Sequence, residues 1–158
     1  MPNTMPPAWI DPHDAGDTLD LQQFPTLLLQ QTAQHQRQAH ILPLLAAHEL
    51  SVPEYRTLAI LDVHGRVNTA RIRELSSMDK AQLSRTLQQL ERRGFIERSI
   101  LPNHERRHWL TLTTEGSEVF GRATEDVRAY QVGLLRSLTS AEREALYAVV
   151  RKLGPPAD

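Results

Sequence analysis

Apolar residues recur at helical spacing through most of the chain, and in one place the period shortens to two. Leu83, Leu87 and Leu90 follow one another at i, i+4 and i+7, which predicts an amphipathic helix over residues 79–93. Residues 95–100 and 108–112 alternate apolar and polar side chains instead, which predicts two strands. The polar run between these strands predicts a β-hairpin with an exposed tip.

Capping signals divide the rest of the chain into helices. Ser51 and Thr139 are each followed three residues later by glutamate, which is the pattern of a capping box. Asp79 and Thr113 are further N-cap candidates. The helices expected besides residues 79–93 cover 19–47, 52–63, 70–76, 113–138 and 140–153, with a kink or break at Pro43 and with Ile72 and Leu75 facing inward.

Composition limits the class of protein. The chain has 158 residues, of which 40% are hydrophobic, so it fits one domain with extensions. It has no cysteine, no apolar run near the roughly 20 residues of a membrane span, and no signal peptide pattern at its start. We therefore expect a cytoplasmic protein without membrane attachment.

Charge is concentrated in the middle of the chain. Residues 71–107 hold nine Lys and Arg against five Asp and Glu, although the whole chain has a formal net charge of -1. Such a basic segment suits a localised anionic partner. An ordinary solvated face has the same composition, so charge alone leaves both interpretations open.

The order of elements favours DNA binding. A short helix, a serine-rich turn, a second helix and a hairpin form the order of a winged helix-turn-helix, in which residues 79–93 are the reading helix. The face opposite its leucines offers side chains that pair with base edges or phosphates, namely Lys80, Gln82, Ser84, Arg85 and Gln88. Arg106 and Arg107 at the hairpin tip can reach phosphate or an adjacent minor groove.

Three segments are typical of a known family, namely LSVPEYRTLAIL (50–61), MDKAQLSRTLQQLERRGFIERS (78–99) and ERRHWLTLTTEG (105–116). Through them the sequence resembles the MarR family of bacterial transcription regulators. The resemblance implies a mainly α fold with a small β-hairpin, a winged helix-turn-helix carrying long N- and C-terminal dimerisation helices, and a DNA contact for Arg98. One departure is at the wing tip, where the family has Asp-Arg-Arg. Counting back from Leu112 without a gap puts His104 at the aspartate, whereas a shift by one aligns Glu105, Arg106 and Arg107 instead, and Arg106 is retained in both alignments.

The resemblance also implies a homodimer and an effector. The partner of each chain would be a second copy, bound through the first and the last two helices, and the DNA partner would be a pseudo-palindromic operator. The apolar residues of two predicted helix faces agree with such an interface: Ala123, Val127, Tyr130 and Leu134, then Leu146, Val149, Val150 and Leu153. Many relatives are repressors released by a small, often aromatic or anionic, ligand.

Four residues are candidates for ligand binding: Arg37, His40, Tyr55 and Arg56. Buried packing or a surface salt bridge is the simpler account of each of them. The predicted organisation is a disordered tail over 1–18, a dimerisation helix over 19–48, the winged helix-turn-helix over 49–113 and dimerisation helices over 114–158.

Two other classes of protein compete with this interpretation. One is a helical adaptor for protein interactions. The coincidence of the basic segment with the hairpin argues against it, because an adaptor does not require that arrangement. A metal-responsive regulator would need clustered ligands, but His35, His40 and His48 do not share one helix face and cysteine is absent. We expect no metal and no cofactor. We also expect no enzyme activity, because no phosphate-binding loop or nucleophile motif occurs.

Overall fold

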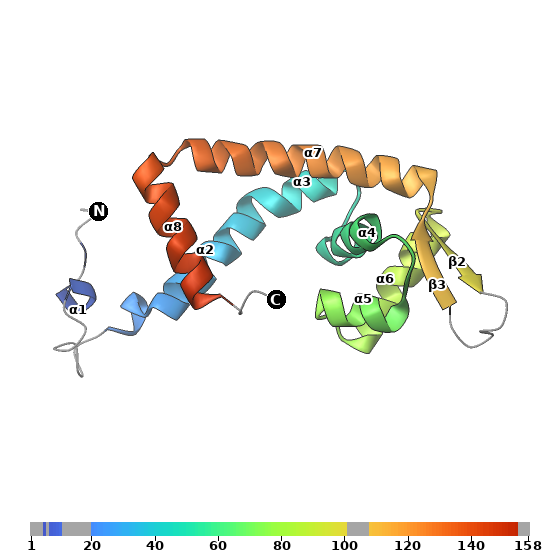
Figure 1. Cartoon of the computed structure of the whole chain (residues 1–158), viewed down its shortest axis with the longest axis horizontal. Coiled ribbons are helices and arrows are strands. Elements are labelled where there is room, and N and C mark those ends of the chain that lie inside the picture. Colours follow the sequence, from blue (N-terminus) through green and yellow to red (C-terminus); the bar gives the residue numbers. More distant parts are fainter. Residues whose placement is uncertain (1–4, 6, 11–19, 101–107, 155–158) are drawn as a thin grey trace. The chain divides into compact units, whose positions relative to one another are not determined.

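The computed structural model describes Met5 and residues 7–10, 20–100 and 108–154 (Figure 1). The chain divides into two compact units, Met1–Ile41 and Leu42–Asp158. The boundary between them falls inside the segment expected to be a single dimerisation helix.

The first unit consists of short helices. They are α1 (Pro7–Ile10), the 3-10 turn η2 (Leu21–Gln23), α2 (Pro25–Gln36) and the π-helical turn η3 (Arg37–Ile41). Helix α1 lies in the segment expected to be a tail. The indole Nε1 of Trp9 donates a hydrogen bond to the carbonyl of Gln23 over 2.8 Å, which connects α1 to the end of η2.

The irregularity expected at Pro43 begins before that residue. Pro43 is the second residue of α3 (Leu42–Ala47), and the π-helical turn η3 directly precedes this helix. A proline cannot donate to the carbonyl four residues back and its ring crowds that carbonyl. A wider π turn is a common way for a helix to absorb such a disruption.

The second unit contains the winged helix. Its elements after α3 are α4 (Val52–His64), β1 (Val67–Asn68), α5 (Thr69–Ser76), α6 (Lys80–Arg92), β2 (Ile96–Ile100), β3 (His108–Leu112), α7 (Thr114–Arg136) and α8 (Ser140–Leu153). Its core gathers residues from α3, α4, α5, α6 and β3, among them the fully buried Leu45, Leu58, Leu61, Ile72, Leu83, Leu90 and Leu110. The leucine face predicted for residues 79–93 is therefore the core face of α6.

The prediction that Leu75 faces inward is wrong. Leu75 is 37% exposed, whereas Ser76 is buried beside Ile72 one helical turn away. Helix α5 stops at Ser77, which is left-handed with φ 56. The hydroxyl of Ser76 accepts a hydrogen bond from the backbone N–H of Met78 over 3.4 Å, so this polar side chain is satisfied inside.

The sheet has three antiparallel strands in the order β1-β3-β2. Strand β1 was not expected, because two residues are too few to show an alternating pattern. Arg98 pairs with Leu110 and Ser99 with Trp109 across β2 and β3. Ser99 Oγ and Trp109 Nε1 are both buried and have no hydrogen-bond partner in the part of the chain that is described.

The predicted N-caps are confirmed. The Ser51–Glu54 and Thr139–Glu142 capping boxes are both complete, and Asp79 accepts from the backbone N–H of Gln82. Hydrogen bonds from the backbone N–H and the hydroxyl of Thr139 hold the pKa of Glu142 below its ordinary value of 4.5.

The start of α7 is packed tightly against the end of the reading helix. The hydroxyl of Thr113 caps α7 by accepting from the N–H of Gly116 over 3.0 Å, and it donates to the carbonyl of Gly94 over 2.6 Å. A Cβ added at Gly116 would lie 1.9 Å from the carbonyl oxygen of Phe95. Only a glycine permits this approach without a shift of the backbone.

Candidate nucleic-acid interface

Helix α6 separates an apolar face from a polar one. Leu83, Leu87 and Leu90 are buried, and so is Thr86, whose hydroxyl donates to the carbonyl of Gln82. The five residues predicted to read DNA from this helix lie away from the core: Lys80, Ser84, Arg85 and Gln88 are exposed and Gln82 is half-buried. The polar face is therefore open along the whole helix.

A hollow of about 470 Å³ lies beside this face. Four of the predicted DNA-binding residues line it, namely Lys80, Ser84, Gln88 and Arg98, together with Thr69, Ala70 and Arg73 of α5 and with Leu83 and Leu87. Gln82 and Arg85 do not line it. The residues on its wall include three cations and no carboxylate, a composition that suits an anionic partner.

The contribution of α5 was missed in the sequence. Thr69 and Arg73 are one helical turn apart and both line the hollow. Their four-residue spacing in the sequence is the signal that indicates a shared helix face. Arg71, also on α5, is paired with Glu74 over 2.9 Å on the exposed surface.

Arg98 of β2 is held in place by the reading helix. Its Nε donates to Oε1 of Glu91 over 2.7 Å, and both side chains are about one-third exposed. A pair at this exposure contributes little to stability, about 0–1 kcal/mol. Its effect is to fix the position of an arginine at the edge of the hollow.

The tip of the hairpin lies outside the described residues. Arg106, Arg107 and His104 belong to this segment. The strands that carry the tip are described, and Figure 1 shows β2 and β3 side by side after α6. The contacts of both arginines stay a prediction from the sequence.

The four residues predicted to bind a ligand fall in different units. Arg37 and His40 lie in η3 of the first unit, where Arg37 donates to Gln34 over 2.8 Å and His40 lies edge-on to His35. Tyr55 and Arg56 lie in α4 of the second unit.

Tyr55 is half-buried against α7 and Arg56 is exposed. The Tyr55 hydroxyl is 3.2 Å from that of Thr124, and its ring centroid is 5.4 Å from that of Phe120. Packing against α7 therefore accounts for Tyr55 without a ligand, and its role as a ligand contact stays a prediction.

Two further observations concern metal binding and membrane spanning. Within the described ranges, no three His, Asp or Glu side chains gather in a group that could hold a metal ion. None of the described helices combines the length and apolarity required to cross a bilayer.

Comparison with known proteins connects this arrangement to one family. Residues 50–108 match the model of the MarR family. The chain is 26% identical over 125 residues to YwaE of Bacillus subtilis strain 168, an uncharacterized HTH-type transcriptional regulator, and the match covers 79% of this chain and 73% of YwaE.

Solved structures of similar fold are also regulators. A mutant MarR from E. coli complexed with operator DNA superposes with a TM-score of 0.73 at 21% identity, covering 87% of this chain and 100% of that chain. The PcaV transcriptional regulator from Streptomyces coelicolor, in complex with its natural ligand, has a TM-score of 0.67 at 24% identity, covering 85% and 94%.

These relatives are transcriptional regulators rather than enzymes, in agreement with the prediction made from the sequence. The mainly helical fold with its small antiparallel sheet is likewise the predicted one. We conclude that residues 50–108 form a MarR-family domain and that the chain has the winged helix-turn-helix fold seen in MarR regulators.

Proposed function

We propose that this protein is a homodimeric, sequence-specific repressor that binds a pseudo-palindromic operator and is released from it by a small organic ligand. The observation that carries the proposal is the open polar face of α6 beside a hollow lined by Arg73, Lys80 and Arg98. Three cations around a reading helix attract phosphates, while Ser84 and Gln88 offer groups for base edges.

The proposed DNA contacts divide into two kinds. Gln82, Ser84, Arg85 and Gln88 would approach bases or flanking phosphates in the major groove, with Lys80 and Arg98 on phosphate. Arg106 and Arg107 would extend the contact to the neighbouring minor groove. The operator complex of the E. coli relative supports DNA as the partner.

Apolar surface on α8 supports the second copy as the other partner. Leu146, Val149, Val150 and Leu153 are between 46% and 61% exposed although they form one stripe. A two-fold dimer would present two reading helices to half-sites about one helical turn, or about 10 base pairs, apart.

A ligand-bound relative supports the effector, since the PcaV structure contains a natural ligand. The candidates in this chain remain Arg37, His40, Tyr55 and Arg56. We propose a cytoplasmic site of action, where the operator would be found.

The decisive experiment is to capture fragments of the native genome with the purified protein and to sequence them. We expect a recurring two-fold motif, bound less tightly as salt rises because the contacts release counterions. Binding without sequence preference, or none at low salt, would contradict the proposed function.

The effector arm has its own test once an operator and an active compound are known. Tyr55→Ala and Arg56→Ala should reduce the response to the compound while retaining operator binding. The expected coupling is about 1–3 kcal/mol in the unmodified protein. A full response from both variants would place the ligand elsewhere.

A further inference from the structure

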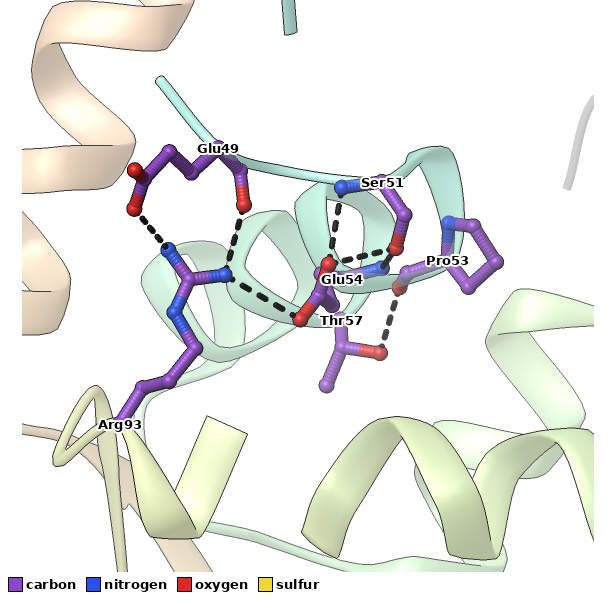
Figure 2. Close-up of polar contacts among 6 residues, drawn as sticks. All are labelled: Glu49, Ser51, Pro53, Glu54, Thr57 and Arg93. Atoms are coloured by element: carbon purple, nitrogen blue, oxygen red, sulfur yellow. Dashed lines mark hydrogen bonds and ion pairs between the residues drawn. The ribbon is translucent and has the colours of Figure 1, made fainter. Parts of the chain in front are cut away.

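Arg93 ends the reading helix and reaches across to the chain that leads into α4 (Figure 2). Its Nη1 donates to the carbonyl of Glu49 over 2.6 Å and lies 3.4 Å from Oε1 of Glu54, while Nη2 lies 3.7 Å from Oε2 of Glu49. The guanidinium also lies 4.5 Å from the ring centroid of Phe95. One side chain thus joins two segments that are about 40 residues apart in the sequence.

Glu54 serves both segments at once. Its Oε2 accepts from the backbone N–H and the hydroxyl of Ser51, which closes the capping box of α4. Its other oxygen, Oε1, faces Arg93. Because the carboxylate is only 6% exposed, it depends on these partners for the interactions that water would otherwise supply.

The same stretch of chain is attached to α7. His48 Nε2 lies 2.7 Å from Oδ2 of Asp126, and the Tyr55 hydroxyl lies 3.2 Å from that of Thr124. Residues 48–55 therefore contact the long helix on one side and the end of the reading helix on the other. A shift of this stretch relative to α7 would change the contacts of Arg93 with Glu49 and Glu54.

Glu49 reinforces this picture. It is a non-glycine residue with a left-handed backbone, φ 55, at the turn between α3 and α4. Arg93 binds both its carbonyl and its carboxylate, so the guanidinium holds a turn that the backbone alone disfavours.

We propose that Arg93 and Glu54 are a positioning pair that sets the orientation of the reading helix against the start of α4. The inference rests on the proposed function, because it assigns these residues a role in DNA affinity. Neither residue touches DNA in this proposal. They act through the placement of Ser84, Arg85 and Gln88 on α6.

The test is a double-mutant cycle on the full-length protein with Arg93→Gln, Glu54→Gln and both together. Each single change should weaken operator binding roughly ten-fold, and the double change should weaken it by about the same factor, because the two residues act as one unit. The slope of log affinity against log salt should stay unchanged, since no phosphate contact is lost.

Arg92→Gln is the matched control. Arg92 is the exposed residue beside Arg93, and its side chain has no hydrogen bond or ion pair among the residues that the structure describes. Its removal lowers the charge by the same amount and should leave operator affinity within about two-fold. Arg93→Lys retains the charge but loses the planar guanidinium with its two Nη donors. Its operator affinity should lie between those of the wild type and Arg93→Gln.

A DNA-independent measurement separates this inference from the proposed function. Amide hydrogen exchange should show that Arg93→Gln lowers protection in the last turn of α6 and in residues 48–54 together. This result is expected even if the protein bound no DNA. Three results would each overturn the positioning pair. The first is a loss of operator affinity in the double variant that equals the product of the two single losses. The others are a shallower salt slope for Arg93→Gln and reduced protection in α6 alone.

Discussion

Gly116 is a residue whose identity is dictated by one neighbouring atom. It is the last residue of ERRHWLTLTTEG (105–116), one of the segments that resemble the MarR family, and the structure gives the reason for a glycine: the carbonyl of Phe95 occupies the space of a side chain. The glycine therefore lets α7 begin directly against the base of the hairpin.

Gly116→Ala should lower the free energy of unfolding by about 1–3 kcal/mol, because the obstructing atoms belong to the backbone and cannot rotate away. Urea unfolding measures the change. Gly121→Ala is the control on the same helix, since no atom lies within 4 Å of an added Cβ there. It should instead stabilise the protein by up to about 1 kcal/mol. Equal behaviour of the two variants would show that the contact at Phe95 is not a constraint.

Two arginines should fail in different ways if α6 and the hairpin tip both contact DNA. Arg85→Ala on α6 should cost roughly 1–3 kcal/mol on operator and relax preference at one base pair. Arg106→Ala should weaken operator and scrambled DNA alike and make the salt slope shallower by about one unit. Salt titrations on both DNAs measure these effects, and an unchanged slope for Arg106→Ala would remove the tip from the interface.

Single residues show where sequence reasoning reaches and where it stops. The leucine face of α6 and the N-caps were predictable, because spacing and hydrogen-bonding chemistry are local. The burial of Ser76 in place of Leu75 was not predictable, because the positions three and four residues after Ile72 both fit one helix face and only packing within the second unit decides between them. The predicted helix ends correctly at Arg93. Its contact with Glu54 could not be predicted, because the two residues are 39 positions apart in the sequence.

At the scale of elements, α8 begins with a capping box of hydrogen bonds between Thr139 and Glu142. The ionised carboxylate of Glu142 accepts from the backbone N–H of Thr139 over 2.7 Å and from its hydroxyl over 2.8 Å. Its pKa is lower in the folded protein, so the stabilisation is fully present above pH 4.5 and is lost as pH falls through the lowered value.

Glu142→Gln should therefore lower the urea midpoint at neutral pH, because a neutral amide oxygen is a weaker acceptor than a carboxylate. The difference from the wild type should shrink once pH falls below 4.5. Glu144→Gln, a change of the same chemistry on the same helix, is the control. A difference that stays constant across this range would mean that the carboxylate is not responsible.

The elements that sequence reasoning missed are short or irregular. Strand β1 has two residues, and η3 replaces regular helix for five, so neither leaves a period to detect. The longer helices α4, α6, α7 and α8 were each predicted within two residues at either end, because their caps are written in Ser, Asp and Thr residues.

On the scale of the whole molecule, the exposed stripe of α8 is what a second copy would cover. Val150→Lys should shift the protein from dimer to monomer in sedimentation, because it would bury an unpaired charge in an apolar interface. Glu144→Lys adds the same side chain to the same helix outside the stripe and should leave the dimer intact. A dimer that survives Val150→Lys would move the interface away from α8.

Trp109 gives the protein an optical reporter on β3, the strand that pairs with the strand of Arg98. Its indole is half-buried on β3, opposite Ser99, with an N–H that has no partner among the described residues. Emission from an indole depends on what surrounds that N–H. Because the chain has two tryptophans, Trp9→Phe would leave Trp109 as the sole tryptophan. A change at the base of the hairpin would then shift the emission maximum of Trp109, so no dye has to be attached.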